Sequence, residues 1–103
     1  MGATAARQAR EILGNAERVI ALELICAAQG LDLRLRAAAG EAPGEGVAEA
    51  EHLVRERIPH LDADRDPGPD LTAALELVRS GALAGLATDR GRAIVGRGRT
   101  RRT

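Results

Sequence analysis

The acidic loop from Asp62 through Asp64 to Asp66 has the spacing that most suggests chemistry. Alternating aspartates begin a calcium-binding loop of the EF-hand type, which also needs glycine at its sixth position and a bidentate glutamate at its twelfth. Those two positions hold Pro67 and Ala73 in this chain. We therefore predict a solvated loop that caps a helix, and no calcium site.

The only histidines, His52 and His60, could join Asp62 as metal ligands. Three scattered ligands without a fourth are weak evidence for a zinc site. We predict no metal ligand in the chain. His60 follows Pro59 at the end of a predicted helix, so we interpret it as a capping or hydrogen-bonding side chain.

Nucleophiles are equally scarce. Ser80 is the only serine, and no histidine or acid stands in a convincing relation to it, so a nucleophilic triad is not supported. The single Cys26 excludes an internal disulfide, and we expect a packed, inert thiol. No glycine-rich phosphate-binding motif occurs. We expect no catalytic residue and no cofactor-binding residue in this chain.

Glu23 is the polar residue with the most informative position. On a helical wheel it falls near the centre of an apolar stripe, flanked by Val19, Ile20 and Ala27. A buried carboxylate must be paired, hydrogen-bonded or protonated, because an unpaired charge there is costly. We predict a structural role for Glu23, in an ion pair with an arginine. A catalytic carboxylate is the alternative, since perturbed groups also cluster at active sites.

The elements that must position these residues are helical. Apolar residues recur at intervals of three and four, which predicts an all-α fold with a long first helix and two shorter ones. The predicted helices cover residues 3–29, 47–58 and 71–80. A short apolar stretch, 82–86, is expected to extend the packing.

Helix ends are predicted from capping residues. Gly30 is expected to stop the first helix, and Pro59 to end the second, because the residue before proline disfavours the helical region. Asp70 is the predicted N-cap of the third helix and Gly81 its C-cap. Residues 31–46 and 59–70 are then loops.

The second half of the first helix, residues 19–28, is apolar on all sides except at Glu23. A helix of this kind is normally buried all round. The chain has no Phe, Tyr or Trp, and a domain of 103 residues without aromatic side chains has a thin core. We predict that other chain segments or other subunits cover this helix.

Charge and hydropathy restrict the location. The apolar run 19–28 is about half of the ~20 residues that span a bilayer, and no signal peptide is evident, so we expect a soluble, cytoplasmic protein. All 15 basic residues are arginine, and six of them follow Asp89. We predict an Arg/Gly-rich, disordered tail over residues 87–103. It could bind nucleic acid through phosphates, but without aromatic residues to stack on bases a solvated terminus is favoured.

Three stretches together resemble the C-terminal part of histidine ammonia-lyases: ERVIALELICAAQGLDLR at 17–34, RERIPHLDADRDPGPDL at 55–71 and ELVRSGAL at 76–83. The resemblance covers residues 1–86. In the second stretch, the residues that match the family pattern are His60, Asp62, Asp64, Arg65, Pro69 and Asp70. Asp66 and Pro67 stand where the family often has an aromatic pair.

This resemblance implies an enzyme that removes ammonia from L-histidine without oxidation and gives trans-urocanate, a step of histidine catabolism. It implies a methylidene-imidazolone electrophile that forms from an internal Ala-Ser-Gly. It also implies a helical homotetramer with long parallel helices in its core and active sites shared between subunits.

The functional residues of the family are not carried over. The chain has no Ala-Ser-Gly and no tyrosine, and the family's active-site glutamate belongs to a motif expected before Met1. We predict a structural segment, inactive alone, whose partners are the rest of a lyase subunit and its homotetramer. The alternatives are a segment of a phenylalanine or tyrosine ammonia-lyase or aminomutase, and an independent helical interaction module with a nucleic-acid-binding tail.

Overall fold

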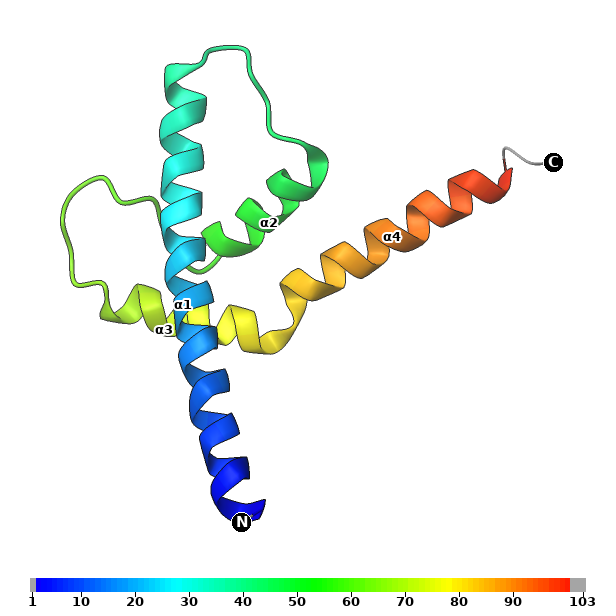
Figure 1. Cartoon of the computed structure of the whole chain (residues 1–103). Coiled ribbons are helices and arrows are strands. Elements are labelled where there is room, and N and C mark those ends of the chain that lie inside the picture. Colours follow the sequence, from blue (N-terminus) through cyan, green and yellow to red (C-terminus); the bar gives the residue numbers. More distant parts are fainter. Residues whose placement is uncertain (1, 101–103) are drawn as a thin grey trace.

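The computed structural model describes the backbone of residues 2–100 and the side chains of residues 2–91. Over that range it is built of helices without strands, which confirms the predicted all-α class (Figure 1). The helices are α1 (Gly2–Ala37), α2 (Glu45–Arg55), α3 (Gly68–Ser80) and α4 (Ala82–Thr100).

Helix α1 is longer than the sequence predicted. Gly30 was expected to stop it, and that prediction is wrong, because the helix continues through Gly30 to Ala37. Glycine inside a helix costs only about 1 kcal/mol relative to alanine. Leu31 and Leu35 are half-buried after it, and their packing favours continuation. The loop that follows is therefore shorter than the predicted 31–46.

The bounds of the next two helices also differ from the prediction. Helix α2 ends at Arg55, and a turn follows in which Ile58 is only 2% exposed. Helix α3 begins at Gly68 with Pro67 in the N-cap position, so the prediction of Asp70 as N-cap is wrong. Its C-cap is Gly81, as predicted, with a φ of 78° in the left-handed region that suits glycine.

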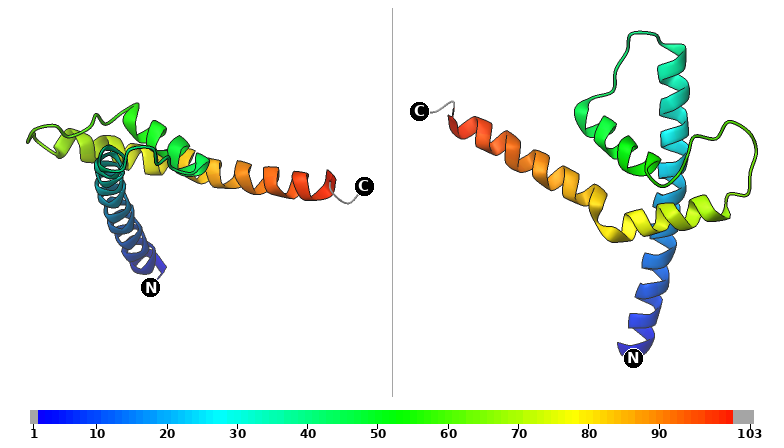
Figure 2. Two further views of the ribbon diagram at one scale, coloured as in Figure 1. Left: turned by 90° about the horizontal axis from the view of Figure 1, so that it is seen from above. Right: turned by 180° about the vertical axis from the view of Figure 1, so that it is seen from behind.

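Helices α2 and α3 pack against a single side of α1, and α4 packs against α2 and α3. Figure 2, seen from above and from behind, shows α2, α3 and α4 on the same side of α1, with α3 crossing it. The buried core is small and contains mostly short side chains: Ala21, Ala28, Val54, Ile58, Ala74 and Leu77. Ala21 and Ala74 are both fully buried, and their small size allows α1 and α3 to approach closely.

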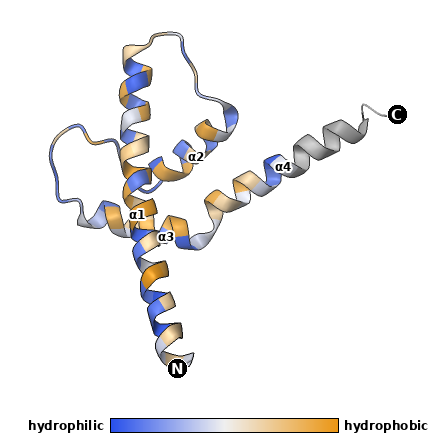
Figure 3. Ribbon diagram, viewed as in Figure 1, coloured by the Kyte–Doolittle hydropathy of each residue, from blue (hydrophilic) through white to orange (hydrophobic). Residues whose placement is uncertain are grey.

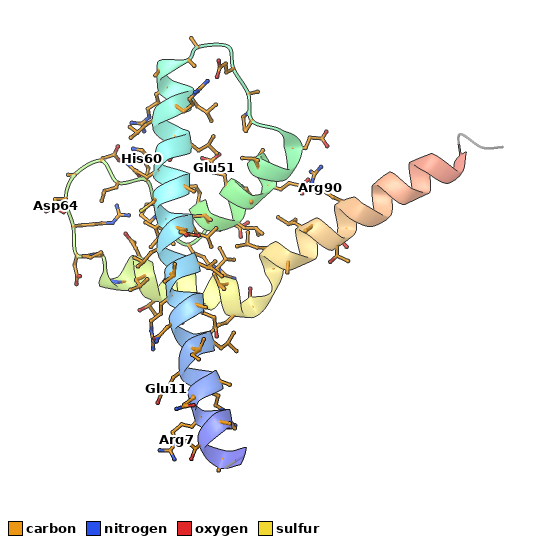
Figure 4. The ribbon with its side chains drawn as sticks, viewed as in Figure 1. Arg7, Glu11, Glu51, His60, Asp64 and Arg90 are labelled. Atoms are coloured by element: carbon orange, nitrogen blue, oxygen red, sulfur yellow. The ribbon has the colours of Figure 1, made fainter. Side chains whose placement is uncertain are left out.

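Helix α4 extends away from this core. Ala82 and Leu83 pack against the core, as predicted for residues 82–86. The sequence predicted a disordered tail over 87–103, and the structure differs, because α4 continues to Thr100; residues 101–103 lie outside the described range. Arg90 links α4 to α2, because its guanidinium donates hydrogen bonds to Glu45 at 3.3 Å and to Glu49 at 2.7 Å (Figure 4).

None of the helices described over residues 2–100 combines the length and apolar character that a membrane crossing requires.

Candidate functional site

The first candidate surface is the side of α1 that faces away from the other helices, here called the outward face. Four of its residues recur at intervals of seven and therefore share one side of the helix: Ile12, Val19, Cys26 and Leu33. Ile12 is 69% exposed, and Val19 and Leu33 are each 55% exposed. Figure 3 shows hydrophobic residues interspersed with hydrophilic ones along α1, which lies in front of α3 in this view. Exposed apolar surface of this extent normally marks an interface.

Glu23 lies in the middle of the outward face, as the helical wheel predicted. Its side chain is exposed, and none of the described side chains forms an ion pair with it. An arginine partner would have to come from outside this part of the chain, so its structural role stays a prediction. Cys26 is also exposed, which corrects the expectation of a packed thiol. Both differences arise because the chain covers only the opposite side of α1.

A second site is a polar cluster on the covered side of α1, centred on Asp32. Its Oδ2 atom accepts hydrogen bonds from Nη2 of Arg55, at the end of α2, and from Nδ1 of His60 at 2.7 Å. The Asp32 and His60 side chains are each 15% exposed, so the contacts are well shielded from water. Figure 4 shows His60 and Glu51 beside the C-terminal half of α1. The cluster joins three parts of the chain at one carboxylate.

The two carboxyl groups of this cluster have pKa values shifted in opposite directions. Burial alone would raise the pKa of Asp32, but hydrogen bonds with Glu51, His60 and Arg55 lower it to about 2. The hydrogen bond to Asp32 raises the pKa of Glu51 above its ordinary value, and burial and the charge of Asp32 act in the same direction. Asp32 is therefore the ionised partner of Arg55, while the charged form of Glu51 is less favoured than that of an ordinary glutamate.

The loop 59–70 is held by hydrogen bonds to α1 and by hydrogen bonds within the loop itself. Gln29 donates to the carbonyl oxygen of Leu61 at 3.0 Å and accepts from the Leu61 N–H at 3.1 Å. Arg65 donates to the carbonyl oxygens of Pro59 and His60 at 2.7 Å and 3.1 Å. It also donates to Asp70 at 2.9 Å, and Asp70 lies in the first turn of α3, because the helix begins two residues earlier at Gly68.

The acidic residues of the loop do not gather around a common point. Asp62 is 78% exposed, and Asp66 accepts the Gly68 N–H at 3.0 Å in a local turn. Nowhere in residues 2–91 do three His, Cys, Asp or Glu side chains come together as metal ligands could. Asp66 thus stabilises the local turn of the loop, and Asp62 points into solvent.

The Ser80 side chain also forms hydrogen bonds to the backbone. Its hydroxyl donates to the carbonyl oxygen of Leu77 at 2.7 Å and accepts the Ala82 N–H at 3.2 Å, which links α3 to α4. A methylidene-imidazolone group would need the sequence Ala-Ser-Gly. The only serine of this chain lies in Arg79-Ser80-Gly81, with arginine in place of the alanine. The residues of this chain therefore do not fit that group, and no chemical step through it is assigned to them.

A hollow of about 780 Å³ separates α1 from the loop 59–70. Apolar side chains of Leu22, Ile25, Leu33, Leu61 and Leu71 form much of its lining. The hollow adjoins the outward face, since Leu33 belongs to both. The chain thus presents apolar surface that its own described residues leave uncovered.

These features describe an all-α segment whose long helix α1 has an exposed apolar outward face. The family model for aromatic amino acid lyase matches residues 1–56, which is more than half of the chain. The chain belongs to the aromatic amino acid lyase family.

Several curated relatives are named histidine ammonia-lyase. The one from Gloeobacter violaceus is 45% identical over 83 residues, which are 81% of this chain and 15% of the relative. The one from Anaeromyxobacter sp. strain K is 46% identical over the same share of this chain and 16% of its own length. The one from Deinococcus radiodurans is 50% identical over 72 residues, 69% of this chain and 13% of the relative. The chain thus spans only a small part of the relatives it matches. No solved structure matches it.

Proposed function

We propose that this chain is the C-terminal helical part of a histidine ammonia-lyase, a cytoplasmic enzyme that converts L-histidine to trans-urocanate and ammonia. The observation that carries the proposal is the identity of 45% and 46% to enzymes of that name along 81% of the chain. The proposal gives this segment no step of the reaction, because it contains no Ala-Ser-Gly and no tyrosine.

Within that enzyme, the segment's proposed task is packing. The outward face of α1 would lie against other helices of the subunit and of a homotetramer, which would bury Ile12, Val19 and Leu33. The Asp32 cluster and the loop 59–70 would keep α2 and α3 fixed behind this face. The exposure of these apolar residues in the chain supports this task, because such surface is normally covered in an assembly.

A chimera tests the proposal. The matching C-terminal segment of the Anaeromyxobacter histidine ammonia-lyase would be replaced by this chain, and the product assayed for urocanate by absorbance and for mass by light scattering. We expect an assembled enzyme that retains histidine turnover within about tenfold of the parent, a barrier change of roughly 1.4 kcal/mol. A soluble but unassembled or inactive product would contradict the proposal.

A matched chimera with the body of a phenylalanine ammonia-lyase separates the two enzyme classes. The family model, described only as aromatic amino acid lyase, covers both. We expect this second chimera to assemble less well, because the buried faces of the body were shaped for another segment. If it assembled and the histidine chimera did not, the phenylalanine or tyrosine lyase alternative would be supported instead.

A further inference from the structure

We propose that an open hollow between the N-terminal half of α1 and the end of α3 binds a phosphate group. Its volume is about 450 Å³, and six residues line it: Arg10, Glu11, Gly14, Asn15, Arg18 and Arg79. Arg79 reaches the hollow from the last turn of α3, and the other five belong to α1. Gly14 is seven residues before the buried Ala21 and shares its side of α1, so the hollow lies apart from the outward face.

The arginines around the hollow keep hydrogen-bond donors that a phosphate can use. Arg79 donates through Nε to Glu17 at 2.6 Å, which fixes the guanidinium and leaves the N–H groups of both Nη atoms. Arg18 donates through Nη1 to the side-chain oxygen of Asn15 at 3.2 Å. Among the side chains of residues 2–91, none forms an ion pair with Arg10 or Arg18.

The charge and shape of the lining favour a tetrahedral oxyanion. A guanidinium can form two parallel hydrogen bonds to a phosphate, and such charge-assisted bonds are stronger than neutral ones. Three guanidinium groups from two helices match the four oxygens of a phosphate, whereas one or two would satisfy a planar carboxylate. When Glu11 in the lining and Glu17 beside Arg79 are counted, the three positive charges still outnumber the negative ones.

Gly14 keeps space open in this hollow. It lies inside α1, where glycine is less favourable than alanine. A Cβ atom built on it would meet only Nη1 of Arg18, at 3.7 Å, so the packing of the chain itself does not require glycine there. A methyl group at this position would occupy part of the hollow beside the Arg18 guanidinium. The glycine therefore favours the ligand over the helix.

Binding is tested on the full 103-residue chain by an NMR titration with sodium phosphate at one pH and at constant ionic strength. The Gly14 amide and the Nε–H groups of Arg10, Arg18 and Arg79 are the signals to follow. We expect saturable shifts with a Kd of roughly 1 mM, which a few charge-assisted hydrogen bonds at an open site would give. Glycerol 3-phosphate should bind within about threefold of inorganic phosphate, and acetate about tenfold more weakly, because the site recognises the phosphate group.

Substitutions in the lining should change the Kd for phosphate in both directions. Arg10→Gln and Arg18→Gln should each weaken binding about fivefold, because each removes one guanidinium. Gly14→Ala should also weaken it, although alanine favours the helix, so a loss of folding would not explain the effect. Glu11→Gln should strengthen binding by roughly threefold, because it removes an opposing charge from the hollow shown near Glu11 in Figure 4.

The matched controls are Arg57→Gln, which removes an exposed arginine after α2, and Gly30→Ala, which fills a helical glycine with nothing within 4 Å of its added Cβ. Both should leave the Kd unchanged. Shifts that do not saturate, acetate that binds as tightly as phosphate, or an Arg57→Gln effect as large as that of Arg18→Gln would overturn the proposal, since each would indicate general attraction of ions to the surface. None of these measurements involves assembly or histidine turnover, so their failure would leave the proposed function intact.

Discussion

At the scale of single residues, Asp32 holds the covered side of the molecule together. One carboxylate oxygen receives Arg55 from α2 and His60 from the loop, so three segments depend on its charge. The surface ion pairs of α4 are different, because Glu45 is 85% exposed and such pairs contribute at most about 1 kcal/mol.

Asp32→Asn should destabilise the chain by about 2–4 kcal/mol, because it leaves the guanidinium of Arg55 shielded and unpaired. Urea unfolding at neutral pH, followed by circular dichroism at a fixed protein concentration, measures the loss. Glu51→Gln is the matched control. Because the pKa of Glu51 is raised in the folded state, removing its charge should leave stability unchanged or increase it. Equal losses from both substitutions would contradict the assigned protonation states.

Acid should weaken the same cluster in a defined window. The folded pKa of Asp32 is depressed from 3.8 to about 2, so its stabilisation is fully present above the unfolded pKa and is lost as pH falls through the folded pKa. Stability should therefore decline between about pH 4 and pH 2. In Asp32→Asn this part of the decline should be absent, and its persistence in the variant would assign the decline to other carboxylates.

Glu23 should prove structural when it is substituted in a whole enzyme that contains this segment. Glu23→Ala would leave a partner arginine buried and unpaired at a cost of roughly 3–5 kcal/mol, whereas Glu23→Gln keeps the shape and some hydrogen bonding and should cost less. Thermal denaturation and turnover of the assembled enzyme are the measurements. A Glu23→Gln enzyme that melts like the parent but loses turnover by two or more orders of magnitude would identify a catalytic carboxylate.

At the scale of elements, the junction between α3 and α4 depends on one backbone conformation. Gly81 has a φ of 78°, and Ser80 bonds both helices across it. This arrangement allows α3 to stop and α4 to start in a new direction within two residues.

Gly81→Ala should destabilise the chain by about 1–2 kcal/mol, the cost of a side chain in the left-handed region. Gly85→Ala is the matched control, because Gly85 lies inside α4 and its added Cβ would meet nothing within 4 Å. It should stabilise the chain by about 0.5–1 kcal/mol. Thermal melts of the two variants at one concentration compare them, and a loss in both would mean that the position of Gly81 is not special.

The pattern of apolar residues was sufficient to predict three helices and the Gly81 cap, because these features depend on neighbours in the sequence. The predictions failed where distant contacts decide. Gly30 resembles a helix stop, yet α1 continues to Ala37, and the packing of Leu31 and Leu35 favours this continuation. Asp70 resembles an N-cap, yet α3 begins earlier, at Gly68, and the Asp70 carboxylate accepts a hydrogen bond from Arg65.

The Asp32 cluster could not be predicted from spacing at all. Asp32 and His60 are 28 positions apart, and Asp32 was assigned to a loop because the helix was expected to stop at Gly30. A helical wheel requires only local periodicity, so the neighbours of Glu23 on α1 follow from the sequence, but its burial does not, and its side chain is exposed. None of the described side chains forms an ion pair with Glu23, so that ion pair remains a prediction.

At the scale of the whole molecule, the chain is a thin plate of 55 × 45 × 18 Å, and the outward face of α1 gives one side of this plate exposed apolar surface. The chain matches only 15% of the length of the Gloeobacter relative. In the proposed enzyme it would therefore pack against a much larger remainder of the subunit. This exposed apolar surface is the feature on which the proposed packing role rests.

The isolated chain should have no ammonia-lyase activity, because it lacks an Ala-Ser-Gly and tyrosine. Purified protein incubated with L-histidine should give no increase in urocanate absorbance above a buffer blank, and the active histidine chimera serves as the positive control. Turnover that scales with the amount of the isolated chain would contradict a purely structural role.

The thinness of the plate has a consequence for amide hydrogen exchange. Among the side chains of residues 2–91, six hydrophobic ones are buried, and only Ala21 and Ala28 of these belong to α1. Exchange of the α1 backbone amides in the isolated chain should proceed through local opening of single turns, so protection should fall gradually toward both ends of α1. In an assembly that covers the outward face, the same amides should exchange only when the partners separate, and their protection should rise together. The exchange rate of one helix would then report on the assembly of the whole enzyme.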